Sequence, residues 1–154
     1  MRWIVVFLTL CLFIPTATAI SISDFCKEEH GNDFELYEYC VKEQTQAKRK
    51  VDQEPKDEVT AYCLEEYAED YDMQSHCIKE QRQAKRKVTQ EQKDEITEYC
   101  LEEYTEDYDM QAYCIKEQRR AKKRTANYPA ELVASCQKEW GVDYEMVESC
   151  LKGD

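Results

Sequence analysis

The sequence predicts an all-α protein made of four tandem α-hairpins, each about 37 residues long and each closed by one disulfide. Three observations support this fold class. Cysteines spaced fourteen positions apart occur four times, at Cys26/Cys40, Cys63/Cys77, Cys100/Cys114 and Cys136/Cys150. Every pair has an aspartate at its midpoint, and these are Asp33, Asp70, Asp107 and Asp143. The chain also has only 3 Gly and 3 Pro, which is few for the many turns of a β fold.

The first 19 residues have the pattern of a secretory signal peptide. A positive start at Arg2 precedes an apolar run over residues 3–14, and small residues lead to the expected cleavage site after Ala19. The apolar run is too short to span about 30 Å of hydrocarbon, so we expect no membrane anchor after cleavage. Removal of this segment discards Cys11 and leaves 20 basic and 33 acidic residues, a net charge of −13. Such a polyanion is not expected to bind nucleic acid.

Eight cysteines remain in the mature chain. Export and an even count at regular spacing indicate disulfides, and if each unit is a duplication, each pair closes within its own unit. The rival interpretation is a metal site. Structural zinc sites use closely spaced cysteines or histidine partners, whereas these pairs are far apart and His30 and His76 are the only histidines. We therefore predict four disulfides, no metal site and a secreted or periplasmic location.

The periodicity within a unit predicts two helices joined at the central aspartate. In the second unit, Val59, Cys63 and Tyr67 follow one another in steps of four, which places them on one helical face. Residues equidistant from the aspartate are expected to face each other. Three positions before it lies an aromatic residue in three units, and three positions after it lies Met73, Met110 or Met146. We expect these pairs to form a core layer, and the aspartate to N-cap the second helix.

The expected units span residues 20–53, 54–90, 91–127 and 128–154. Ser21 and Asp24 are predicted to cap the first helix, and Pro55 and Pro129 are predicted in first helical turns. A continuous helix over residues 73–104 is an alternative, because nothing in that stretch breaks a helix. We expect only limited stacking of the units, since no second apolar face is evident.

No stretch of the chain carries a catalytic motif, so we predict a non-enzymatic protein without a cofactor. A Cys-x-x-Cys redox motif is absent from the sequence. Repetition of a small module favours a protein-interaction or spacer role with an unidentified protein partner. One alternative is a calcium- or metal-binding envelope protein that uses acidic turns such as residues 69–72, although these lack the spacing and glycine of a calcium loop. A second alternative is a disulfide-stabilised inhibitor or toxin-like protein.

The repeated pattern itself resembles a known kind of unit. Residues Cys100–Lys116 read Cys-x6-Asp-(Tyr/Phe)-x-(Met/Leu)-x3-Cys-(Ile/Val/Leu)-Lys. This pattern is similar to short Cys-x13-Cys helical-hairpin repeats of uncharacterised bacterial secreted proteins, and it covers nearly all of the mature chain. The resemblance implies an α-hairpin in each unit.

Overall fold

The computed structural model describes residues 20–153, and every regular element in that range is an α-helix. The helices are α1 (Ile22–His30), α2 (Phe34–Gln53), α3 (Glu58–Glu66), α4 (Tyr71–Gln90), α5 (Glu95–Glu103), α6 (Tyr108–Thr125), α7 (Ala130–Trp140) and α8 (Tyr144–Lys152). Successive helices pair as hairpins, so the expected all-α fold of four disulfide-stapled hairpins is confirmed. The signal peptide expected over residues 1–19 lies outside the described residues.

One disulfide closes each hairpin. The bridges are Cys26–Cys40, Cys63–Cys77, Cys100–Cys114 and Cys136–Cys150, with Cα–Cα distances of 5.7 to 5.9 Å. The first cysteine of each of the first three units has no exposed surface. A bridge that closes a loop of about 15 residues contributes roughly 3 kcal/mol in the loop-entropy model, which is a large share of the stability of so small a unit.

The central aspartate of every unit lies at the N-cap of the second helix. In the second unit, Asp70 Oδ1 accepts hydrogen bonds from the backbone N–H of Asp72 at 3.0 Å and of Met73 at 3.1 Å. The same N-cap role belongs to Asp33, Asp107 and Asp143. These contacts satisfy amide groups that have no partner inside the helix.

The linkers correct two of the sequence-based expectations. The first-turn placement of Pro55 is wrong, because α3 begins at Glu58 and Asp57 caps it by accepting from Thr60 N at 3.1 Å. Pro129 occupies the N-cap position just before α7. The continuous helix over residues 73–104 does not form, since α4 ends at Gln90 and Asp94 caps a new helix.

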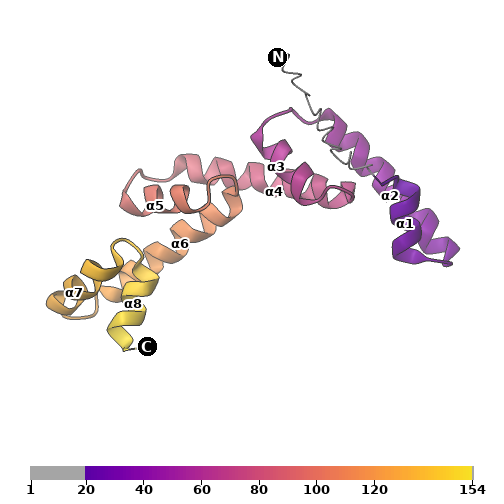
Figure 1. Cartoon of the computed structure of the whole chain (residues 1–154). Coiled ribbons are helices and arrows are strands. Elements are labelled where there is room, and N and C mark those ends of the chain that lie inside the picture. The colour runs from indigo at the N-terminus through magenta and orange to yellow at the C-terminus, as the bar shows by residue number, and fades with distance from the viewer. Residues whose placement is uncertain (1–19, 154) are drawn as a thin grey trace, which may run out of the picture.

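Consecutive units stack, which corrects the expectation of limited stacking. The second helix of each unit packs against the second helix of the next, so that α2, α4, α6 and α8 follow one another in contact. The shorter α1, α3, α5 and α7 each lie against their own partner. Figure 1 shows the result as a curved array with α1 and α2 at one end and α7 and α8 at the other.

The apolar cores lie across the junctions between units. One core joins Val51 of α2 with Val59 and Cys63 of α3 and Ile78 of α4, and Tyr108 of α6 packs against it. The next core repeats this arrangement with Val88, Ile96, Ile115 and Tyr144. Each core therefore takes side chains from three successive units, and a single hairpin does not contain all of the apolar residues that bury its own disulfide.

Candidate interaction surfaces

A glutamine from each long helix holds the N-cap of the next unit. Gln81 Nε2 donates to Asp107 Oδ1 at 2.7 Å, and Gln81 Oε1 accepts from Tyr108 N at 2.8 Å. We call this pair of bonds the glutamine clasp. It occurs three times, formed by Gln44, Gln81 and Gln118. An amide side chain has one donor end and one acceptor end, so it matches a capping carboxylate beside a free backbone N–H.

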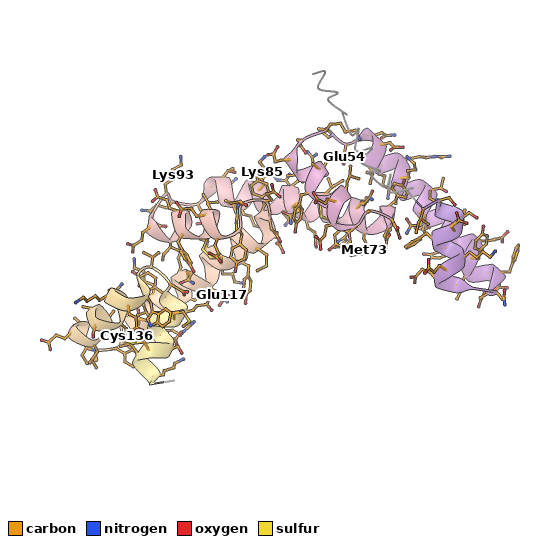
Figure 2. All side chains as sticks on the ribbon, viewed as in Figure 1. Glu54, Met73, Lys85, Lys93, Glu117 and Cys136 are labelled. Carbon is orange, nitrogen blue, oxygen red and sulfur yellow. A yellow bond between two sulfur atoms is a disulfide. The ribbon has the colours of Figure 1, made fainter. Side chains whose placement is uncertain are left out.

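A lysine one turn further along stacks on the aromatic residue that follows the capping aspartate. Lys85 Nζ lies 5.1 Å from the ring centroid of Tyr108, a cation–π distance, at the place where the second unit meets the third (Figure 2). Lys85 also forms an ion pair with Glu58, which raises the pKa of Lys85 and lowers the pKa of Glu58. Equivalent stacking joins Lys48 to Tyr71 and Lys122 to Tyr144.

A tyrosine hydroxyl completes the clasp in the two later junctions. Tyr62 Oη donates to Asp107 Oδ2 at 3.1 Å, and Tyr99 Oη donates to Asp143 Oδ2 at 3.3 Å. Burial, followed by the nearby carboxylate, raises the pKa of both tyrosines to about 12. Burial also acts to raise the pKa of Asp107, but hydrogen bonds led by that from Gln81 outweigh it, and the pKa lies below its usual value. Phe25 takes the place of the tyrosine in the first unit and has no hydroxyl to donate.

Each clasp belongs to a longer buried strip that the sequence reasoning missed. The strip has the spacing Gln-x2-Ala-Lys-x2-(Val/Thr) and occurs at residues 44–51, 81–88 and 118–125. We call it the docking strip. Its glutamine, alanine and final residue are buried in every copy, with at most 7% of their surface exposed. The sequence feature that could have revealed the docking strip is the recurrence of Gln-x2-Ala in each long helix. Polar residues that repeat in register indicate a specific contact.

The expected core layer of aromatic and methionine side chains lies instead at the hairpin tips. Met73, which is labelled in Figure 2, is 40% exposed, and Trp140 and Met146 are each 38% exposed. Tyr67, the partner of Met73, is half-buried, and so are both members of the third unit's pair, Tyr104 and Met110. The packing role expected for the methionines is therefore wrong for Met73 and Met146. The contacts between units are made by another face of the long helix. The methionine position, three residues after the aspartate, therefore lies at the edge of the core.

The tip residues line shallow recesses beside the disulfides. In the second unit, Tyr67, Met73 and Cys77 share a recess of about 280 Å³ with Asp109 and Met110 of the third unit. In the fourth unit, Trp140, Met146 and Cys150 line a recess of similar volume. We call the aromatic and methionine residues on either side of each tip the tip pair. Because the units stack in register, a tip pair recurs in the second, third and fourth units, whereas His30 and Leu36 hold these positions in the first.

Hydrogen bonds from the protein engage the capping aspartates that lie in the junctions. Asp70 Oδ1 accepts from Gln44 at 2.7 Å and from two backbone amides of its own helix. His76 is 3.4 Å from Glu80 on the same helix. Within residues 20–153, no three His, Cys, Asp or Glu side chains lie close enough together to hold a metal ion. Over the same range, no helix is both long and apolar enough to cross a bilayer.

No known protein-family model, curated protein or solved structure matches this chain. The resemblance of Cys100–Lys116 to short bacterial repeats therefore stays a prediction. The four disulfides are typical of a protein that resides in an oxidising compartment outside the cytosol.

Proposed function

We propose that this chain is a secreted or periplasmic repeat protein without enzymatic activity, which presents its tip pairs to a protein partner at regular intervals. The observation that carries this proposal is the repetition of Tyr67/Met73, Tyr104/Met110 and Trp140/Met146 on a stacked array. Exposed aromatic and methionine side chains are enriched where proteins bind one another. A fixed interval between equal patches favours a multivalent partner, because the second contact becomes intramolecular.

Two features support a scaffold over a catalyst. The disulfides are largely buried, because seven of the eight cysteines are at most 8% exposed and Cys150 is half-buried. Thiol chemistry requires an accessible sulfur. The acidic residues at the turns cap helices and bind the preceding unit. These roles also weigh against the calcium-binding alternative, since Asp70 and Asp107 already accept several hydrogen bonds each.

The proposal is tested by capture of extracellular or envelope proteins on the immobilised mature chain. The tip variant M73S/M110S/M146S changes partly exposed positions. The matched control L101S/L132S changes exposed apolar residues that line neither tip recess, at 37% and 54% exposure. We expect the control to retain the bound proteins and the tip variant to lose them, with equal helical content in both. Capture that is equal for both variants, or absent from the unmodified chain, contradicts the proposal.

A further inference from the structure

The three junctions of the array define one recurring pair of surfaces. The first is the docking strip, which ends each long helix before the linker. The second is the face that receives it, formed by the capping aspartate and by the residues one, four and eight positions later. In the second unit these are Asp70, Tyr71, Gln74 and Ile78, and in the third they are Asp107, Tyr108, Gln111 and Ile115. We call this the receiving face.

The receiving face is covered in the second and third units. Gln74 and Ile78 are each 2% exposed, and Gln111 and Ile115 are 3% and 2% exposed. Ile78 belongs to the same apolar core as Val51, the last residue of the preceding docking strip. The strip and the face therefore form one interface of constant design, with the clasp at one end and an apolar contact at the other.

The first unit has the corresponding four positions, with Tyr37 in place of Gln74, but no docking strip lies on them among residues 20–153. Its members are Asp33, Phe34, Tyr37 and Val41. Phe34 is 68% exposed, and Val41 is half-buried, whereas its counterpart Ile78 is enclosed. Beside them lies an open groove of about 550 Å³, lined by Tyr37, Glu38, Val41, Lys42, Thr45, Gln46 and Arg49.

We propose that this groove binds the end of an α-helix from a different protein, with the spacing Gln-x2-Ala-Lys-x2-Val. This proposal rests on the protein-binding function proposed above and names the chemistry of one partner. The established junctions show what each position of that helix would contact. Its glutamine would bridge the Asp33 carboxylate and the Phe34 amide, its lysine would lie over the Phe34 ring, and its valine would cover Val41. The alanine would let the two helices approach closely.

The chain's own docking strips are not free to fill this groove. Each is already buried in a junction, with Ala47, Ala84 and Ala121 at 2%, 2% and 0% exposure. A second copy would have to open one of its junctions, with loss of a clasp and an apolar core, before it could donate a strip. A helix that carries an uncovered strip has no such cost, and helix-in-groove binding of this kind is a common mode of recognition.

The test uses the mature chain and a synthetic peptide that copies residues 78–91, which contain the second docking strip. A short peptide is marginally helical in water. A lactam between the Lys79 amine and the carboxyl group of a glutamate introduced by Q83E, both on the exposed face, therefore holds it as a helix. Fluorescence anisotropy measures its binding. We expect V41E in the chain to weaken binding at least tenfold, and the Q81A peptide to bind several-fold more weakly. The control L132E, on the exposed face of α7, should bind like the unmodified chain.

Three results would overturn the inference. The first is that the peptide does not bind the unmodified chain. The second is that it binds V41E as tightly as the unmodified chain while circular dichroism shows both chains to be folded. The third is that sedimentation shows self-association of the mature chain and that V41E abolishes this self-association. A second copy of the chain would then be the occupant of the groove. The tip variant separates this inference from the proposed function. If V41E loses the peptide while M73S/M110S/M146S still captures the same proteins, the proposed tip function fails and the groove assignment stands.

Discussion

At the scale of single residues, the clasp glutamine determines how two units meet. Gln81 reaches across the junction with both ends of its amide, and its side chain is 6% exposed. A buried amide with both ends bonded is worth more than its net hydrogen-bond energy suggests, because its removal leaves other buried groups without partners. The backbone N–H of Tyr108 and the carboxylate of Asp107 are the groups that lose a hydrogen bond when Gln81 is removed. The clasp therefore specifies register between units as well as contributing stability.

Substitution Q81A should lower the free energy of unfolding by about 1–3 kcal/mol, because it leaves the Tyr108 amide without its partner and removes one of the three hydrogen bonds to Asp107 Oδ1. Urea denaturation followed by circular dichroism measures the change. The matched control is Q83A, two residues away on the exposed face of the same helix, and it should change stability by less than about 0.5 kcal/mol. Equal effects of the two substitutions would show that the clasp contributes nothing specific.

The ion pairs of Glu148 predict how the free energy of unfolding depends on pH. Arg124 forms bonds of 2.7 to 2.9 Å with its two oxygens, and Lys152 lies 2.9 Å away. These bonds lower the pKa of Glu148 from 4.5 to about 2. The carboxylate is therefore bound more tightly in the folded chain, so its stabilisation is fully present above pH 4.5 and is lost as the pH falls towards 2.

We expect E148Q to be less stable than the unmodified chain at neutral pH and to approach it as the pH falls from about 5 to 2. The midpoints of urea denaturation, measured for E148Q and for the unmodified chain across this pH range, test this prediction. The exposed Glu139 of the same unit supplies the control E139Q, whose difference from the unmodified chain should stay nearly constant. A gap between E148Q and the unmodified chain that does not narrow with acid would contradict the assignment.

At the scale of helices, each long helix has two roles along its length. The first half of α4 pairs with α3 and carries Cys77, while its second half carries the docking strip for the third unit. The 20-residue length of α2 and α4 follows from this double use, since the 9-residue α1, α3 and α5 carry no docking strip. The same division explains why no core is complete within one unit.

The hairpins could be predicted from the sequence because their determinants lie close together in it. A cysteine pair and its central aspartate fall within fifteen residues, and each residue type has a strong local meaning as a bridge or an N-cap. The stacking could not be predicted in the same way. Its contacts are made by Gln44 and Ala47 and their copies, and such residues on a helix do not mark an apolar face. The exposure of Phe34 could not be predicted either. Its copies Tyr71, Tyr108 and Tyr144 contact a lysine of the preceding unit, whereas no such helix lies on Phe34 among residues 20–153.

Reduction of the four disulfides should abolish most of the helical structure in the absence of denaturant. Each bridge contributes roughly 3 kcal/mol, and the apolar core between two bridges is too small to replace that amount. Far-UV circular dichroism of the oxidised and the fully reduced, alkylated chain in the same buffer measures the loss. Retention of the helical signal after reduction would show that the clasps and junction cores suffice without the bridges.

At the scale of the whole molecule, the array depends on contacts between neighbours. The long helices make contact in series, α2 with α4, α4 with α6 and α6 with α8. Stability in such arrays is approximately the sum of unit terms and junction terms. The curvature visible in Figure 1 follows from repeating one junction geometry three times. The spacing of the tip pairs, and with it any multivalent binding, therefore depends on the three clasps together.

The triple variant Q44A/Q81A/Q118A should keep its disulfides but lose the fixed shape of the array. A compact domain of this length has a radius of gyration of about 14 Å, and an unfolded chain of about 38 Å. We expect the unmodified chain to lie between these values by small-angle X-ray scattering, with a well-defined maximum dimension. Loss of the clasps should broaden the distance distribution, because the hairpins can then pivot at their linkers.

The control for this experiment is Q46A/Q83A, which removes two exposed amides from the same helices and should leave the scattering profile unchanged. The non-reduced peptide map of both variants should still show bridges within units only, so that a change in shape reports the junctions and not the hairpins. If the triple variant scatters like the unmodified chain, the apolar cores around Ile78 and Ile115 hold the junctions without help. The glutamines would then contribute to register alone. A clasp can select which residues of two long helices lie opposite each other even where the array keeps its shape without it.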